Sequence, residues 1–489
     1  MPLPRLWTIA FTALCMLASG AAHAQDTVSA PRVQRVEEGL LTAVTIRGRS
    51  SEMPLLERMR FYNVPGVSIA VIDDGRIAWA RAYGVKRAGG TEPVDTATLF
   101  QAASISKPVS AIAALRLVEQ GRLSLDADVN ASLTSWRLEE NGFTRRQPVT
   151  LRRLLSHNAG LTVHGFRGYA SGEDVPTLVQ VLGGEQPANS AAVRPDTIPG
   201  SIWRYSGGGS SVVQQLMEDI TGKSFPALLR ELVLEPADMV HSGFEQPLPA
   251  HRVAAAATGH RPGGQPVAGA WHTYPEMFAA GLWTTPLDLA RLAIEVQRAA
   301  AERPGSILSP ATAREMLTVQ AGAYGLGFGL EPGDGWTGFS HGGANEGYRA
   351  LLYAMTNGRG AVVMTNGDNG SPLAAEILRA IAREYDWPVY RTVERDVVEL
   401  TPAQLRSFAG DYTFQRNGQT LTLSLAAADG SLVSAGPPLG ERTLYYGGSD
   451  SFFLLASPGV LRFERDAAGR VSAVVLEGAG PPLRLQRRQ

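Results

Sequence analysis

Cysteine is almost missing from this chain of 489 residues, and the single one, Cys15, lies in a stretch with the pattern of a signal peptide. Arg5 gives this stretch a basic start, and the apolar run 6–18 that follows is too short to span a bilayer. Ala22-His23-Ala24 has the small-x-small pattern of a cleavage site. We therefore predict a signal peptide over residues 1–24 and an exported protein, periplasmic or secreted. Without cysteine, the rest of the chain has no disulfide, thiolate nucleophile or cysteine-bound metal.

Long hydrophobic runs and an excess of charge are also absent. After residue 24, no segment is long and apolar enough for a membrane span. Lys+Arg 45 balance Asp+Glu 46, and no basic run stands out, so nucleic acid and anionic membrane surfaces are not expected partners. The 8 histidines show no His-Glu-x-x-His or similar spacing, so we predict no metal site and no cofactor. The oligomeric state stays open.

One stretch, 101–108, carries a candidate nucleophile and its base. It leads into a helix predicted over 107–120 that is apolar nearly all round and therefore buried. Pro108 fits only in the first turn of that helix, which places Ser104 at or just inside the helix start. Lys107 then projects beside Ser104, because positions i and i+3 share a helix face. If Lys107 lies in the low-dielectric wall of a core, desolvation favours the neutral amine, which can act as a base. A serine at a helix start, however, is often only a helix cap.

Strand patterns stand at both ends of the first 385 residues, with helices between them. The runs 67–72 and 76–80 flank Asp73-Asp74-Gly75 and predict a β-hairpin. Another amphipathic helix is predicted around 54–62. The remaining predicted strands are 324–330, 336–341, 348–355 and 361–365, and the predicted helices are 151–156, 175–182, 211–221, 225–234, 287–300 and 372–385. This order indicates an α+β fold, in which a sheet assembled from both ends is flanked by helices and carries an inserted helical lobe.

The last 90 or so residues have a different pattern, with short alternating strands separated by turn residues. Strands are predicted at 411–414, 419–425, 432–435, 452–455, 461–465 and 471–476. They predict a small antiparallel barrel or sandwich without a catalytic constellation. The predicted domains are thus a catalytic domain over 25–386, a linker over 387–400 and a small all-β domain over 401–489.

Two further stretches contain glycines beside reactive side chains. In Trp203–Ser210, three glycines let the backbone bend just before a helix and leave Tyr205 exposed on a loop. In Phe339–Gly347, strand positions without side chains, Gly342 and Gly343, let a ligand approach the backbone. Either feature alone is also typical of ordinary structure, since tyrosine is often a core residue and a strand glycine often marks a bulge.

The ordered set Ser104-x-x-Lys107, Tyr205-Ser206-Gly207 and His341-Gly342-Gly343 resembles the serine β-lactamase and penicillin-binding-protein superfamily. In that family, Ser-x-x-Lys, Tyr-x-Asn and Lys-Thr-Gly (or His-x-Gly) elements surround one cleft. The stretches 154–161 and 281–285 are similar to two others of the β-lactamase, esterase and D-peptidase branch. The resemblance spans about residues 50–385 and implies a β-lactamase/transpeptidase-like fold, to which a barrel-like tail is a common appendage.

The resemblance also implies roles. Ser104 would be the nucleophile, Lys107 its base, and Tyr205 the group that moves a proton between nucleophile, leaving group and water. The amides of Ser104 and Ala344 would form the oxyanion hole, with His341, Gly342, Gly343 and Gly207 around the substrate. Tyr205 can serve in this way only if it lies close to Lys107. The expected partner is a small ester, amide or peptide, including one derived from the cell wall.

Two positions depart from the family pattern. Gly207 replaces an asparagine whose amide would contact the substrate or the lysine. His341 replaces lysine and, with an ordinary pKa near 6.5, is mostly neutral at pH 7, so a permanent charge for a substrate carboxylate is lost. Both changes favour an esterase or peptidase over an efficient β-lactamase. The alternative is a protein that binds penicillin or peptidoglycan fragments with little or no turnover.

Two other residues, Ser340 and His157, are rival candidates for a catalytic role. Gly338-Phe339-Ser340-His341-Gly342 matches the Gly-x-Ser-x-Gly elbow of α/β-hydrolases, which would make Ser340 the nucleophile. That elbow leads into a helix and needs an acid and then a histidine later in the chain, whereas His341 is the last histidine. His157, in a tight Ser-His-Asn turn, is more typical of a structural hydrogen bonder than of a general base.

Overall fold

The computed structural model describes residues 30–416, 418–478 and 480–488. The predicted signal peptide, 1–24, lies outside them. The chain divides into two compact units, one made of 56–374 with the segment up to Val33, the other of 34–55 with 375–489. The domain boundaries proposed from the sequence stay predictions. Within the described ranges, no helix combines the length and apolar character that a bilayer crossing requires.

A six-stranded antiparallel sheet organises the first unit, in the order β3-β2-β9-β8-β7-β6. Its strands are β2 (Gly66–Asp73), β3 (Arg76–Gly84), β6 (Gly329–Pro332), β7 (Thr337–Asn345), β8 (Tyr348–Met355) and β9 (Arg359–Thr365). β2 pairs with β9, so segments from both ends of the unit meet in the middle of the sheet. The predicted hairpin is present, and its turn consists of Asp74 and Gly75, which both have the positive φ that a two-residue turn of this kind needs. The expected fold class is confirmed.

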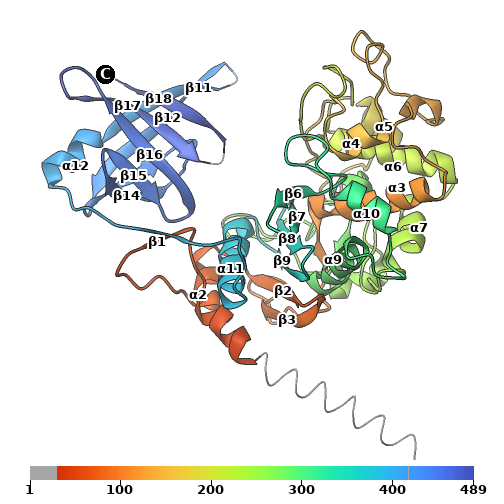
Figure 1. Ribbon diagram of the computed structural model, residues 1–489, viewed down its shortest axis with the longest axis horizontal. Coiled ribbons are helices and arrows are strands. Elements are labelled where there is room, and N and C mark those ends of the chain that lie inside the picture. Colours follow the sequence, from red (N-terminus) through yellow and green to blue (C-terminus); the bar gives the residue numbers. More distant parts are fainter. Residues whose placement is uncertain (1–29, 417, 479, 489) are drawn as a thin grey trace, which may run out of the picture. The chain divides into compact units, whose positions relative to one another are not determined.

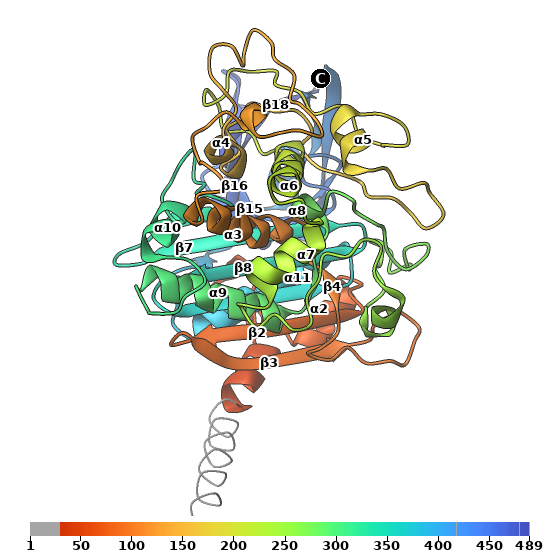
Figure 2. The same ribbon diagram turned by 90° about the vertical axis from the view of Figure 1, so that its right-hand side faces the viewer.

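Helices fill the long insertion between β3 and β6 (Figure 2). α3 (Ser106–Glu119) is buried along almost its whole length, and it shares one apolar core with α6 (Gly207–Thr221) and α9 (Pro286–Ala300). α9 also packs against β2, β3, β8 and β9. The other helices of this unit are α4 (Leu151–Leu155), α5 (Leu178–Gly183), α7 (Phe225–Leu229), α8 (Met277–Ala280) and α10 (Pro310–Met316). Along the chain, the boundaries between the two units fall within α2 (Leu55–Phe61) and within α11 (Gly370–Glu384).

Some predicted boundaries were wrong. α6 begins at Gly207, earlier than expected, because the Ser206 side chain caps it by accepting from the Gly209 amide. The helix expected to run to residue 234 stops being α-helical at Leu229 and continues as a wider π turn. The strand expected from residue 324 begins only at Gly329, and β7 runs on to Asn345.

The second unit contains a closed barrel of β11 to β18 (Figure 1, blue). Its strands are β11 (Gly410–Arg416), β12 (Gln419–Ala428), β13 (Ser431–Ala435), β14 (Arg442–Gly448), β15 (Ser451–Leu454), β16 (Ser457–Arg465), β17 (Val471–Gly478) and β18 (Gly480–Arg487). α12 (Pro402–Phe408) adds Leu405 and Phe408 to the apolar core. β1 (Val44–Ile46) pairs with β10 (Val393–Arg395), and the Val44 amide donates to the Leu455 carbonyl, which ties 34–55 to this unit.

Candidate active site

Ser104 lies just before α3 rather than in its first turn. It sits in a 3₁₀ turn, Ala103–Ile105, between the short strand β4 (Phe100–Gln101) and the helix. Ala103 has φ +50°, a left-handed conformation that is uncommon for alanine and costs free energy. Ser106 fixes the turn, because its Oγ donates to the Ala103 carbonyl at 2.6 Å and accepts from the Leu282 amide at 3.0 Å. The half-buried Ser104 side chain is thereby held at one place.

Lys107 meets Ser104 as the i to i+3 spacing predicted. Its Nζ donates to Ser104 Oγ at 3.0 Å and to the Ala279 carbonyl at 2.9 Å. The side chain is only 4% exposed. Nζ also lies 4.9 Å from the centre of the Tyr205 ring. The three residues of the predicted catalytic set are therefore neighbours.

Tyr205 is held between two histidine rings. Its ring centroid lies 4.2 Å from that of His157 and 5.2 Å from that of His164. The expectation that Tyr205 is exposed was wrong, because these contacts leave it half-buried. Helix α6 begins two residues later, so the capped helix start fixes the backbone that carries the ring.

Gly207 stands where a larger residue would meet close neighbours. A Cβ there would lie 3.1 Å from both the His164 carbonyl oxygen and the Phe166 ring. The Gly207 amide donates to the same His164 carbonyl at 2.9 Å. The segment 164–166 therefore fills the space beside the position at which the family pattern has asparagine.

Strand β7 presents alternate residues to solvent and to the interior. Gly342 and Ala344 are exposed, whereas His341, Gly343 and Asn345 are buried. A Cβ on Gly343 would lie 2.2 Å from the Ala102 carbonyl oxygen, so only glycine lets β7 lie against the turn before Ser104. Asn345 reinforces this contact, since its Nδ2 donates to Gln101 Oε1 at 2.8 Å.

His341 is a neutral, buried imidazole. Its Nδ1 lies 2.6 Å from the Gly342 carbonyl oxygen, which can only accept, so Nδ1 carries the proton. Nε2 then presents a lone pair, and it has no hydrogen-bond partner within the described part of the chain. Burial, together with the nearby Lys107 charge, lowers the pKa of His341 to about 3.

His157 and Tyr324 complete an aromatic cluster that the sequence did not place at the site. His157 Nδ1 accepts from the Ser206 amide at 3.3 Å, which agrees with a structural role, and burial holds its pKa well below the ordinary value. Tyr324 packs edge-on against His157 at 4.9 Å and against His341 at 6.2 Å between ring centroids. Its hydroxyl donates to the Gly327 carbonyl. Only an aromatic residue before a glycine-rich run marked this position in the sequence.

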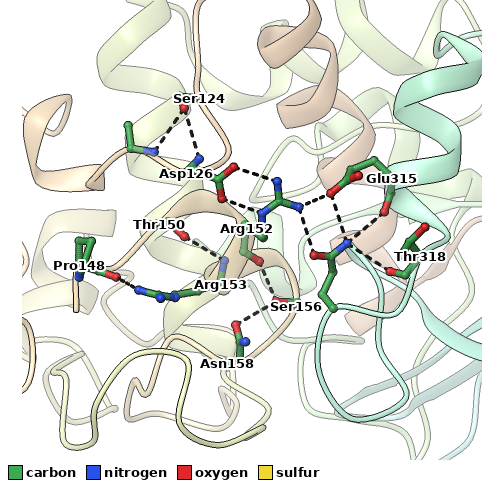
Figure 3. A network of polar contacts seen from close by, with 12 residues as sticks. Ser124, Asp126, Pro148, Thr150, Arg152, Arg153, Ser156, Asn158, Glu315 and Thr318 are labelled. Carbon is green, nitrogen blue, oxygen red and sulfur yellow. Dashed lines mark hydrogen bonds and ion pairs between the residues drawn. The ribbon is translucent and has the colours of Figure 1, made fainter. Parts of the chain in front are cut away.

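A polar network around Arg152 anchors the helix that precedes His157 (Figure 3). The Arg152 guanidinium donates to both carboxylate oxygens of Asp126, at 2.7 and 2.9 Å, and also to Glu315. These bonds tie α4 to α10 and keep the pKa of Asp126 below its usual value. At the end of α4, Ser156 Oγ donates to Asn158 Oδ1 at 3.0 Å, which braces the turn that carries His157.

Ser340 lacks the setting of a nucleophile elbow. It lies inside β7, and the chain continues through a turn directly into the antiparallel strand β8, with no helix between the two strands. In the described ranges, histidine and acidic side chains also form no group of three or more that could hold a metal ion.

The fold and the Ser104–Lys107–Tyr205 grouping define a protein of the β-lactamase and penicillin-binding class. A sequence profile described as Beta-lactamase matches residues 55–385, and the chain belongs to this family.

Individual relatives fit that assignment. Penicillin-binding protein 4 of Amycolatopsis lactamdurans is 27% identical over 376 residues, covering 73% of this chain and 94% of that protein. Esterase EstB of Burkholderia gladioli is 31% identical over 200 residues, which cover 38% of this chain and 49% of the esterase. Among solved structures, the octameric penicillin-binding protein homologue from Pyrococcus abyssi matches with a TM-score of 0.61 at 22% identity, covering 88% of this chain and 98% of that one. A D-alanine carboxypeptidase AmpC from Burkholderia cenocepacia matches with a TM-score of 0.53 at 20% identity, over 66% of this chain and 96% of that one.

Proposed function

We propose that the protein is a serine hydrolase that works through an acyl-enzyme. Ser104 Oγ attacks the substrate carbonyl carbon while Lys107, as the free amine, takes the hydroxyl proton. The amides of Ser104 and Ala344 stabilise the negative charge that develops on the carbonyl oxygen. The observation that carries the proposal is the 3.0 Å contact between Nζ of the buried Lys107 and Ser104 Oγ.

The same groups then serve the departure of the leaving group and, after it, the hydrolysis of the acyl-enzyme. Tyr205, close to Lys107, passes the proton to the leaving group as its bond to the acyl carbon breaks. Water then attacks the acyl-enzyme and gives up a proton to the Lys107–Tyr205 pair, and the pair passes a proton to Ser104 Oγ as its bond to the acyl carbon breaks, which releases the acid and free Ser104.

The proposed substrates are esters, amides or peptides without an obligatory free carboxylate. His341 is neutral and buried, so it offers no fixed positive charge where the family pattern has lysine. Gly207 offers no amide, and segment 164–166 occupies the adjacent space. The similarity to an esterase supports this choice. Export, and a substrate derived from the cell wall, belong to the same proposal.

Hydrolysis of p-nitrophenyl acetate by wild type and Ser104→Ala tests the proposed function. We expect the wild type to release p-nitrophenol and to be blocked by a fluorophosphonate, and Ser104→Ala to do neither. Release at an unchanged rate by a folded Ser104→Ala variant would overturn the assignment of the nucleophile.

A second candidate is a penicillin-binding protein with little turnover, which the similarity to penicillin-binding protein 4 favours. A fluorescent penicillin distinguishes the two functions. A label on Ser104 that persists for hours, with no ester hydrolysis, supports the binding protein. Rapid loss of the label, or ester hydrolysis without any labelling, supports the hydrolase.

A further inference from the structure

The indole of Trp203 stands at the edge of the candidate site and has no role in the steps above. It comes two residues before Tyr205, and the residue is 46% exposed. Single exposed apolar side chains are common on protein surfaces, so exposure alone decides nothing. The position of this indole connects it to the reaction, because it belongs to the same short segment as the proposed proton donor.

A row of aromatic rings joins Trp203 to Tyr205. The Tyr205 ring lies against His157, with 4.2 Å between the ring centroids. His157 contacts Tyr324 at 4.9 Å, and Tyr324 contacts Trp203 at 6.1 Å, again between ring centroids. The indole is therefore the outer end of a row whose inner end is the proposed proton donor.

Arg204, between the two aromatic residues, points to the other side of the chain. Its guanidinium donates to Asp196 and, at 3.0 Å, to the Leu161 carbonyl. Such alternation is typical of an extended segment, so Trp203 and Tyr205 share one face. Their Cα atoms, two residues apart, are separated by at most about 7 Å. The indole and the tyrosine ring thus stand side by side along one wall.

One part of the indole is held in place and the rest is open. A Cβ on Gly322 would lie 3.3 Å from Cγ and 3.5 Å from Cδ1 of Trp203, so the loop there touches the five-membered ring. Tyr324, from the same loop, lies tilted at 45° to the indole. These contacts fix the orientation of the ring, and its remaining apolar surface faces solvent.

This open surface lies on the leaving-group side of the site. In the proposed reaction Tyr205 passes a proton to the leaving group, so the leaving atom lies beside its hydroxyl. Tyr324 also contacts His341, at 6.2 Å between ring centroids, so the row follows the His341 end of β7. The acyl carbonyl, by contrast, is assigned to Ala344, further along the strand. A chain of a few carbons attached to the leaving atom can therefore reach the indole.

We propose that the Trp203 indole binds an apolar, preferably aromatic, leaving group and so determines part of the substrate specificity. The proposal rests on the proposed function, because it assigns the leaving half of the substrate of Ser104. Paired aromatic rings gain free energy beyond that of the buried area, which favours a flat ring over an open chain. Burial keeps the pKa of His157 low and that of Tyr324 high, so both are neutral at pH 7 and suit a neutral ligand.

Four esters, which form two pairs of isomers, test this assignment. 3-Phenylpropyl acetate carries a ring on its leaving half, and methyl 4-phenylbutanoate carries the same ring on its acyl half. Propyl acetate and methyl butanoate are the corresponding esters without the ring. A pH indicator follows the acid that each ester releases. We expect kcat/KM for 3-phenylpropyl acetate to be about tenfold higher than for propyl acetate.

Replacement of the indole should remove this preference. Trp203→Ala lowers kcat/KM for 3-phenylpropyl acetate about tenfold. It leaves kcat/KM for the other three esters within about twofold of wild type. Trp203→Phe keeps a flat ring and retains most of the preference. Phe61→Ala, which removes another exposed aromatic side chain, on α2, is the matched control and leaves all four esters unchanged.

An equal loss for all four esters in Trp203→Ala would show that the indole only supports the segment of Tyr205, and it would overturn the proposal. Equal kcat/KM for 3-phenylpropyl acetate and propyl acetate in wild type, with hydrolysis that depends on Ser104, would also overturn it and leave the hydrolase standing. No Ser104-dependent hydrolysis of any of the four esters would overturn the hydrolase, and this proposal with it.

Discussion

The barrel and the first unit of this protein differ in their buried polar groups. In the barrel, the buried polar side chains among described residues are Ser431 and Ser434, and each donates a hydrogen bond to a backbone carbonyl. The first unit buries Lys107, His157, Glu276 and His341, and it leaves Nε2 of His341 and both carboxyl oxygens of Glu276 without a protein partner.

Buried polar groups of this kind cost stability, since each loses its hydration. In the first unit, several of them gather around Ser104, whose preceding residue also has an unfavourable φ. A core that contributes only to stability is expected to resemble the core of the barrel, where the buried side chains are apolar or are serines that donate to backbone carbonyls. The comparison therefore supports the first unit as the place of the proposed chemistry.

Removal of the buried amine has the largest expected effect. Lys107→Ala leaves Ser104 without a base, and kcat/KM for an ester should fall by about 10⁴-fold. Steady-state kinetics on p-nitrophenyl acetate measure the loss. Lys223→Ala, which breaks only an exposed ion pair with Glu231, is the control and keeps full activity. A loss under tenfold in Lys107→Ala would contradict the role of the lysine.

A cavity in the barrel core should lower stability without lowering activity. Leu485 is fully buried there, and Leu485→Ala should destabilise the barrel by about 3 kcal/mol. Denaturant unfolding measures the free energy, and ester hydrolysis in buffer gives kcat/KM. Thr420→Ala, at an exposed position, is the control. A tenfold fall in kcat/KM for a Leu485→Ala protein that is still folded would give the barrel a part in the chemistry.

An added methyl group at Gly343 should separate β7 from the turn that carries Ser104. The Cβ of Gly343→Ala would overlap the Ala102 carbonyl oxygen, so the strand must shift and kcat/KM should fall by about 10²-fold. Thermal unfolding of Gly342→Ala, where the new Cβ meets only open space and one atom at 3.9 Å, should show little change in stability. Full activity in Gly343→Ala would mean that the close approach is not needed.

Glu276 should make the first unit less stable as the pH rises. Burial raises its pKa to about 8, so the folded protein keeps a proton that the unfolded chain loses above its ordinary value near 4.5. The unfolded state then binds fewer protons, and stability falls between about pH 4.5 and pH 8.

The substitution Glu276→Gln removes that dependence. At pH 8 it should raise the free energy of unfolding by about 4 kcal/mol relative to wild type, and at pH 4.5 by almost nothing. Denaturant unfolding at the two pH values measures the difference, with the exposed Glu235→Gln as control. An equal effect at both pH values would show that Glu276 does not titrate in this range.

The smallest expected effect concerns His341. Because its pKa lies near 3, His341 stays neutral from pH 5 to pH 8, and the pH profile of kcat/KM should have the same shape in wild type and His341→Asn over that range. An inflection near pH 6.5 in wild type that disappears in His341→Asn would contradict the neutral, buried imidazole.

Much of this arrangement follows from local patterns. The hairpin at Asp74-Gly75, the buried helix after Lys107 and the meeting of Ser104 with Lys107 depend on turn chemistry, periodicity and i to i+3 spacing. In the barrel, alternation revealed six strands but missed β14 and β18. β18 begins with Gly480-Pro481-Pro482, and β14 ends in a glycine pair, and such residues usually indicate turns.

The remaining features depend on contacts between distant segments. Nothing in the residue type predicts a positive φ for Ala103, which the surrounding packing imposes. Glycines suggested that β7 ends at His341, yet the strand continues because Gly343 fits against the Ala102 carbonyl. Tyr205 is half-buried because His157 and His164 from another loop enclose it.

Intact-protein mass spectrometry with peptide mapping tests the central claim most directly. The protein is mixed with p-nitrophenyl acetate and quenched in acid within milliseconds to seconds. We predict one added acetyl group that maps to Ser104, decays as the product acid forms, and is absent from Ser104→Ala. An acetyl group on another residue, or steady hydrolysis by Ser104→Ala, would contradict the acyl-enzyme at Ser104.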